Sequence, residues 1–294
     1  MPTLNQKMAP EVLSLNYPFQ WQGLEDFRYA KDERGIPCVN MGRKWGLQYN
    51  PITIIQFGLY NLQRYAQHLG NKELIAVKQV GRWLVENFKP WHENMGAWIF
   101  QYDLDFYGPR APWISAMAQG QGISFLLRFY SLQSDETLLE ICQKAFRSFL
   151  HPVEKGGVVS KFPDGAIVFE EFPTETPPHV LNGHIFALLG IHDFAQFFSD
   201  NSARTLFDDA IEGLKQNLHH YDTGYWNLYD LHPTRRLASP MYMKVHIQLM
   251  QILYEMTGET QFKKFAQRCQ TYLKNPVSRI RWFFRKVHEK VKYG

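Results

Sequence analysis

Cysteine is scarce in this chain of 294 residues. The three cysteines, Cys38, Cys142 and Cys269, lie far apart, with no Cys-x-x-Cys spacing and no Cys/His cluster. This pattern supports neither a disulfide framework nor a zinc site, because both need cysteines in matched numbers and spacings. We therefore expect a reducing environment, no metal and no cofactor.

Long apolar runs and common catalytic signatures are also missing. No uncharged apolar stretch reaches the roughly 18 residues of a membrane span, and the first residues lack the segments of a secretory signal. We therefore expect a cytoplasmic protein. There is no Gly-rich phosphate loop, nucleophile elbow or His-Glu-x-x-His motif. The sequence thus gives no support to the enzyme classes that these motifs mark, and we expect no nucleic-acid partner.

Aromatic side chains, by contrast, are abundant. They make up 15% of the residues, beside 45% apolar and 20% charged residues, which is the composition of a globular protein. Buried rings account for part of this content, but clefts that bind carbohydrate also use flat rings. The formal net charge of +4 suits an anionic small molecule or polymer.

Four pairs of helices are predicted to follow one another, because apolar residues recur at three- and four-residue steps. Three pairs are followed by a short stretch, rich in glycine and aromatic residues, that is typical of a β-hairpin or turn. The unit recurs at roughly 60–70 residues, a weak internal repeat. The predicted helices are 52–65 with 72–88, 112–132 with 135–150, a helix from Val180 with 202–219, and 240–257 with 260–274; the inserts are 96–104, 156–169 and 221–231.

Such helix pairs, each burying one face against the next, favour a mainly α fold. We predict an incomplete α/α toroid with short β-hairpin inserts; a short solenoid is the alternative. The predicted organisation is an irregular segment 1–48, a helical domain 49–275 and a basic amphipathic tail 276–294.

The first helix of each pair carries polar or small residues in apolar surroundings, for example Gln56, Gln119, Asn182 and Tyr242. Inner helices of a toroid would do this, because their inward faces line a wet cleft. Glycines beside these residues also permit close helix packing. We expect both effects.

The tail interleaves six basic residues with apolar ones such as Ile280, Phe283 and Phe284. A helix of this kind can lie on an anionic membrane or contact an anionic polymer. The alternative is a final helix that docks its aromatic residues and leaves its charges in solvent. Peripheral membrane contact and homodimer formation are kept as hypotheses.

Carboxylates, tyrosines and histidines are the candidates for chemistry. Glu170 and Glu171 follow a predicted hairpin, and either one is a candidate to point into the cleft; the alternative is a pair of solvated loop carboxylates. Tyr242 and His246 are four residues apart and so share a helical face. A single histidine there is more often a satisfied core residue.

Charged residues elsewhere add further candidates. Arg110 and Arg128 flank the inner helix of the second pair, and either could bind a substrate carboxylate. Asp222 and Asp230 each follow a tyrosine, and the Asp222-Thr-Gly sequence is typical of a turn.

Several motifs occur together in one known family. They are Tyr49-Asn-Pro-Ile-Thr-Ile-Ile-Gln-Phe-Gly-Leu, Pro112-Trp-Ile-Ser-Ala-Met-Ala-Gln-Gly-Gln-Gly-Ile-Ser, Glu170-Glu-Phe-Pro-Thr, Val180-Leu-Asn-Gly-His-Ile-Phe-Ala-Leu-Leu-Gly, Tyr221-Asp-Thr-Gly and Tyr229-Asp-Leu. In this order they resemble the C-terminal domain of heparosan-type D-glucuronyl C5-epimerases, over about residues 45–275. The resemblance implies an α/α toroid-like array.

The resemblance also implies a reaction, the conversion of glucuronate to iduronate in an anionic polysaccharide by removal and return of the C5 proton. By matching motifs, Tyr229 and Tyr242 fall on active-site tyrosines of the family and Glu171 on its active-site glutamate. These three are the predicted catalytic residues. The predicted substrate contacts are Gln119, Asn182, His232 and His246.

Three departures from the family pattern bear on this prediction. Phe172 and His232 stand where the family has a tyrosine and an arginine, and the β-rich portion of the animal enzymes is reduced to about residues 90–111. A lyase or glycoside hydrolase acting on a uronate-containing glycan remains an alternative, with Asp222 or Asp230 as the second carboxyl for hydrolysis. A non-catalytic relative that binds such a glycan is the other.

Overall fold

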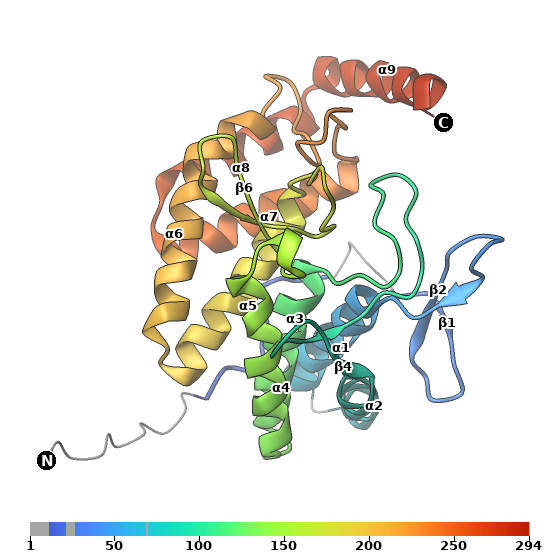
Figure 1. Ribbon diagram of the computed structural model, residues 1–294. Helices are drawn as coiled ribbons and strands as arrows, with labels where there is room; N and C mark the ends of the chain where they lie inside the picture. The colour runs from blue at the N-terminus through green and yellow to red at the C-terminus, as the bar shows by residue number, and fades with distance from the viewer. Residues whose placement is uncertain (1–11, 22–26, 69, 294) are drawn as a thin grey trace, which may run out of the picture.

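The computed structural model describes residues 12–21, 27–68 and 70–293, most of which are helical (Figure 1). The mainly α prediction is therefore confirmed. The helices are α1 (Pro51–His68), α2 (Asn71–Asn87), α3 (Ala116–Tyr130), α4 (Glu136–Phe146), α5 (Leu181–Phe198), α6 (Asn201–Asn217), α7 (Pro240–Thr257), α8 (Thr260–Lys274) and α9 (Pro276–Tyr293), with short 3-10 turns η1 (Arg147–Leu150), η2 (Val153–Lys155) and η3 (Leu218–Tyr221). Among these described residues, no helix is both long and apolar enough to cross a bilayer.

Short strands form three small antiparallel sheets. β4 (Phe88–Pro90) pairs with β5 (Gly96–Trp98), and β6 (Val159–Lys161) pairs with β7 (Ile167–Phe169). The strands β5, β6 and β7 lie in the predicted inserts, whereas β4 lies outside the insert 96–104. The third insert, 221–231, makes isolated bridges only. The segment 1–48, predicted to be irregular, contains a third sheet, β1 (Ala30–Lys31), β2 (Pro37–Asn40) and β3 (Leu47–Gln48). Strands of two to four residues are too short to show an alternation of apolar and polar residues in the sequence. Residues 1–11 and 22–26 of this segment lie outside the described residues.

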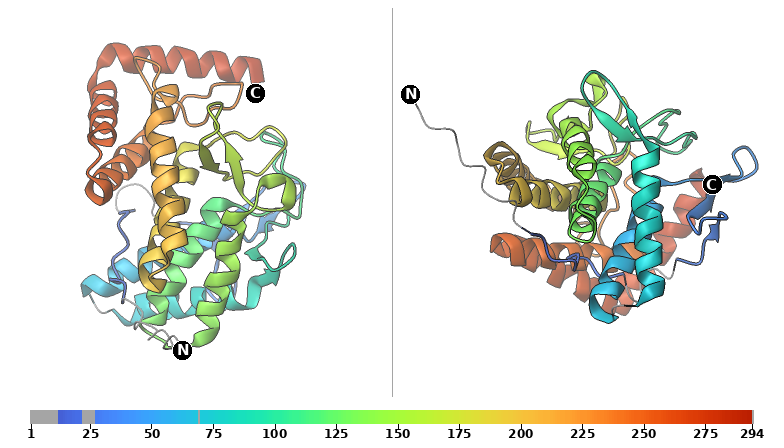
Figure 2. Two further views of the ribbon diagram at one scale, coloured as in Figure 1. Left: turned by 60° about the vertical axis from the view of Figure 1, so that its left-hand side comes forward. Right: turned by 90° about the horizontal axis from the view of Figure 1, so that it is seen from below.

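The helices are arranged as pairs in a row. The inner helices α1, α3, α5 and α7 pack on one another in chain order, and each carries its own outer helix, α2, α4, α6 or α8 (Figures 1 and 2). This order agrees with an incomplete α/α toroid. Helix α9 lies across one end of the row in Figure 1 and in the left view of Figure 2.

Helices α3 and α5 cross at a point where only glycine fits. A Cβ atom on Gly190 would lie 2.2 Å from the carbonyl oxygen of Gly120, and one on Gly120 would lie 2.7 Å from Cα of Ala187. Real Cβ atoms do not approach backbone so closely. The two inner helices therefore touch backbone to backbone.

A buried ion pair joins the same two helices. Arg128 Nη1 donates to Asp193 Oδ2 at 2.5 Å, and Ser124 Oγ donates to the same oxygen at 2.6 Å. Both charged side chains are buried. Arg128 is thus committed to the interior and is not placed to bind a substrate, while Arg110 is exposed beside Asp105.

Candidate active site

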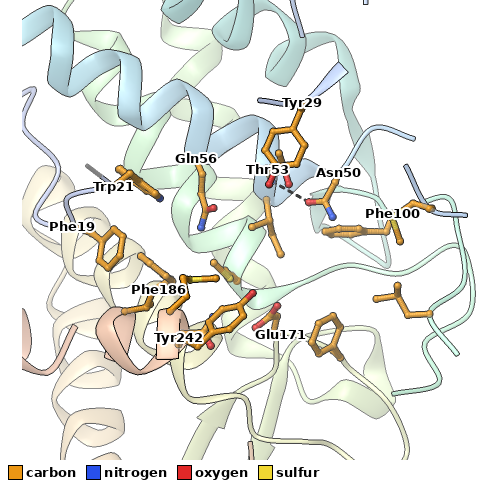
Figure 3. Close-up of a pocket in the computed structure, with 18 of the residues that line it drawn as sticks. Phe19, Trp21, Tyr29, Asn50, Thr53, Gln56, Phe100, Glu171, Phe186 and Tyr242 are labelled. Atoms are coloured by element: carbon orange, nitrogen blue, oxygen red, sulfur yellow. Dashed lines mark hydrogen bonds between the residues drawn. The ribbon is translucent and has the colours of Figure 1, made fainter. Parts of the chain in front are cut away.

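A pocket of about 260 Å³ lies between the first and last inner helices (Figure 3). Asn50 and Thr53 at the start of α1 form one wall, and Tyr242 of α7 stands on the opposite side with Glu171 next to it. Trp113 and Phe186 add aromatic surface. We call this the main pocket.

A second hollow of about 590 Å³, the side pocket, adjoins it. Both pockets are lined by Leu104, Phe172 and Tyr242, so these residues stand at their junction. The side pocket is further lined by Tyr229 and Arg236. Together the two pockets form one cleft.

Of the two adjacent glutamates, the structure directs Glu171 to the main pocket and Glu170 away from it. Glu170 is fully buried; its carboxylate contacts the Ser160 hydroxyl, His179 Nδ1 at 2.5 Å and the His179 backbone N–H at 3.1 Å. Its carbonyl accepts from Ala116 N at 2.9 Å, which ties strand β7 to the start of α3. Glu170 is therefore structural, and its partners fix where the next residue points.

Glu171 is 6% exposed and lines the main pocket. Its Oε2 atom has no hydrogen-bond partner among the described residues. Burial raises the pKa of this carboxyl to about 8, with a smaller increase from the charges of Asp230 and Glu170, while Arg236 opposes the shift. A carboxyl that titrates near neutrality can both accept and return a proton in that range.

Gly183 at the start of α5 makes room for this carboxyl. A Cβ atom there would lie 2.6 Å from both Cβ and Oε2 of Glu171. We predict that Gly183→Ala destabilises the fold by about 1–3 kcal/mol, because the glutamate must shift in a closely packed site. Urea unfolding measures this change in the free energy of unfolding. If Gly183→Ala destabilises the Glu171→Gly variant, which lacks both clashing atoms, by the same amount, another contact is responsible.

Two of the predicted tyrosines meet at the cleft. The Tyr229 and Tyr242 rings are 4.7 Å apart between centroids and inclined by 65°. Tyr242 lies in the first turn of α7, where its backbone N–H donates to the capping Ser239 Oγ at 3.2 Å. Burial, followed by the charge of Glu171, raises the pKa of Tyr229 well above its usual value. Tyr229 is therefore a protonated phenol at neutral pH.

A polar cluster that sequence reasoning missed stands beside these tyrosines. The Tyr107 ring stacks on Phe172 with centroids 4.6 Å apart, and its hydroxyl donates to Asp230 and accepts from Arg236. Arg236 also contacts Asp230 at 3.3 Å, and its guanidinium lies 5.2 Å from the Tyr229 ring centroid. The sequence offered one signal, the two departures at Phe172 and His232, because a chain that keeps the reaction would have to supply the missing hydroxyl and cation from other positions.

Of the four predicted substrate contacts, Asn182 lines the main pocket, and its buried Oδ1 has no partner in the described part of the chain. Gln119 lies in the interior, where Nε2 donates to Gly96 O at 3.0 Å and Oε1 accepts from Trp98 N at 3.2 Å. Gln119 therefore holds strand β5 and lines neither pocket. Its amide is therefore occupied by backbone hydrogen bonds and is structural.

The two predicted histidines also lie outside both pockets. His246 is buried, accepts at Nδ1 from Asn227 Nδ2 at 2.5 Å, and lies roughly parallel to the Tyr229 ring. Burial lowers the pKa of His246 to about 3, so it is neutral and supports Tyr229. His232 bonds to Thr234 Oγ1 at 2.9 Å and packs on the Tyr107 ring. Across the described residues, no group of three or more His, Cys, Asp or Glu side chains is placed to hold a metal.

Residues 92–271, more than half of the chain, match the protein family described as D-glucuronyl C5-epimerase C-terminus. The chain belongs to this C5-epimerase family. It is 31% identical over 207 residues to the D-glucuronyl C5-epimerase of Caenorhabditis elegans, an alignment that covers 63% of this chain and 33% of the relative. It is 30% identical over 174 residues to an uncharacterized protein of Methanocaldococcus jannaschii, covering 58% and 56%.

The resemblance predicted from the motifs is confirmed at the level of the family. The chain spans a third of the nematode relative and about half of the archaeal one. The C5-epimerase match contains Glu171, Tyr229 and Tyr242 but begins after α1. The wall of the main pocket that carries Asn50 and Thr53 therefore lies outside the matched segment.

Proposed function

We propose that this chain is a polysaccharide epimerase that inverts C5 of glucuronate residues and so converts them to iduronate. One observation carries the proposal: Glu171, a buried carboxyl whose pKa lies near neutrality, lines the same pocket as Tyr242 (Figure 3). The proposed substrate is an anionic, uronate-containing polysaccharide, because the side pocket adjoins the main pocket and offers space beside the reacting sugar.

The reaction requires a base, an acid and a means of stabilising negative charge. The C5 proton is α to a carboxylate and only weakly acidic, so its removal creates an enolate-like intermediate. Ionised Glu171 takes this proton, and the electron pair of the C–H bond moves onto the uronate carboxylate. The sugar ring would lie between these two side chains, so that the Tyr242 hydroxyl gives a proton to C5 on the face opposite Glu171. The two side chains then exchange protons with solvent to restore the starting state.

Arg236 is the residue that we assign to the uronate carboxylate. It lines the side pocket next to Tyr229, and the charge that collects on the enolate would lie within reach of its guanidinium. The Tyr107 hydroxyl, held by Arg236 and Asp230, stands beside Phe172. These two residues would compensate for the arginine and the tyrosine that the family pattern has at positions 232 and 172.

Hydrolysis finds less support in the site. It needs a second carboxyl facing Glu171 across the glycosidic bond, but neither Asp222 nor Asp230 lines the main or the side pocket. Asp222 accepts from Tyr272 Oη at 2.9 Å, and Asp230 is held by Tyr107 and Arg236.

The test is incubation with unsulfated heparosan in heavy water. We expect deuterium to appear at C5 of the uronate by NMR, and Tyr242→Phe to lower the rate by about 10²–10⁴ because the proton donor is lost. Tyr130→Phe is the matched control, since the Tyr130 hydroxyl bonds to Glu136 outside both pockets.

The same incubation separates the alternatives. An intact polymer without deuterium, from a protein that unfolds cooperatively, would contradict epimerisation of this substrate. A shortened polymer or the absorbance of an unsaturated uronate would assign the site to a hydrolase or a lyase instead.

A further inference from the structure

Helix α9 has a docked face and an outward face. On the docked face, Trp282 Nε1 donates to Ala238 O at 2.9 Å, and the ring stacks on Trp226 with centroids 5.6 Å apart. Glu289, two turns further on, is buried and accepts from Leu237 N at 3.5 Å. The helix is thus fixed to the segment that precedes α7.

The outward face is apolar although it meets solvent. Its five large side chains are between 46% and 67% exposed: Val277, Ile280, Phe283, Phe284 and Val287. At about 100° per residue they occupy an arc of about 120°, centred opposite Trp282. An apolar face of this width on an otherwise docked helix points to a further contact.

Cations border this face on both sides. Arg281 and Arg285 lie along one edge, and Arg279 and Lys286 along the other, by the same helical spacing. Glu289 is the single acid in the sequence of α9, and it lies on the docked face, where Lys286 and Arg285 contact it. The outward side of the helix is therefore apolar in the middle and basic at the edges.

The apolar surface continues beyond the helix itself. A hollow of about 890 Å³ runs beside α9 and is lined by Leu273, Pro240 and Trp226 as well as by Phe283 and Phe284. Lys244, exposed on α7, adds another cation at its border.

We propose that α9 is a docking helix for the surface of a bilayer that contains anionic lipids. Its apolar centre would enter the boundary between headgroups and acyl chains, while Arg279 and Lys244 beside it meet lipid phosphates. A second copy of this face would bring cations against cations. An anionic polysaccharide would satisfy the charges but leave the two phenylalanines and the isoleucine in water, so the bilayer fits the whole face best.

Vesicle sedimentation with the full chain tests this assignment. We expect binding to vesicles of phosphatidylcholine mixed with phosphatidylglycerol, and little binding to phosphatidylcholine alone. Phe283→Ser/Phe284→Ser should weaken binding by at least about tenfold, since two rings no longer enter the bilayer. Arg279→Gln/Lys244→Gln should weaken it by about fivefold for each charge removed.

The matched control is Ile75→Ser/Leu150→Ser, which removes two apolar side chains of similar exposure from other elements. It should bind as the unchanged chain does. Equal binding by the Phe283/Phe284 variant, or no binding to anionic vesicles at all, would overturn the proposal. So would a concentration-dependent dimer that the same variant abolishes, because the face would then join two copies. None of these outcomes depends on whether the chain epimerises a uronate.

Discussion

Glu171→Gln is expected to lower C5 proton exchange by at least about 10³-fold, the largest catalytic effect that the structure predicts. The amide keeps the size of the side chain but cannot take a proton. For the unchanged chain, kcat/KM should rise with pH up to about 8, because burial raises the pKa of Glu171 to about that value and the base must be ionised. The exchange rate measured against pH by NMR checks both points.

The same substitution should change how stability depends on pH. The Glu171 pKa rises from 4.5 in the reference state to about 8 in the fold, so the folded chain holds a proton that the unfolded chain has lost. The free energy of unfolding is therefore unaffected by this carboxyl below pH 4.5 and falls as pH rises from 4.5 to 8, by on the order of 5 kcal/mol at most. Glu171→Gln removes that loss.

Urea unfolding at pH 5 and pH 9 therefore completes this test. The free energy of unfolding of Glu171→Gln should be close to that of the unchanged chain at pH 5 and larger than it at pH 9. A variant that keeps proton exchange, or that shows the same loss of stability towards pH 9, would contradict the role given to this carboxyl.

Arg128→Met is expected to destabilise the fold by about 3–5 kcal/mol, a large part of the stability of an ordinary domain. The substitution leaves Asp193 buried without its cation, in contact with Ser124 only. Because the pair joins α3 to α5, the loss should appear as an earlier midpoint in urea unfolding with little change in slope.

A double substitution separates the pair from the packing around it. Arg128→Met/Asp193→Leu replaces both charges by apolar groups, and we expect it to recover most of the loss, as buried ion pairs often allow. If the double variant is no more stable than Arg128→Met, the arginine acts through its other contacts, such as the Tyr17 ring beneath it.

The limits of the later helices could be predicted closely, because their ends carry local signals. Helix α7 begins after Ser239 with proline at its first position and ends at Gly258 in a left-handed conformation, and α8 ends before Pro276. Helix α3 was predicted from residue 112 but begins at Ala116. Trp113 instead exchanges backbone hydrogen bonds with Phe100, a contact that no local signal announces.

Some residues of the candidate site could be predicted from the sequence and others could not. Glu171, Tyr229 and Tyr242 stand in motifs that the family shares, so the sequence was sufficient to propose them. Tyr107 and Arg236 are 129 residues apart, in two loops that meet only in the folded chain. No spacing rule connects these two residues. The helical periodicity of a sequence also does not distinguish a polar residue that faces a cleft from one, such as Gln119, that binds the backbone of a neighbouring strand.

The walls of the main pocket come from opposite ends of the chain, and this has a consequence for synthesis. Asn50 is translated 192 residues before Tyr242, which at about 5–20 residues per second takes roughly 10–40 s. During that interval α1 and α3 can already pack, while the apolar and aromatic surface that will face α7 stays open to water. The emerging chain therefore exposes its binding surface before that surface can bind anything, and this is the stage at which a chaperone would have most of it to cover.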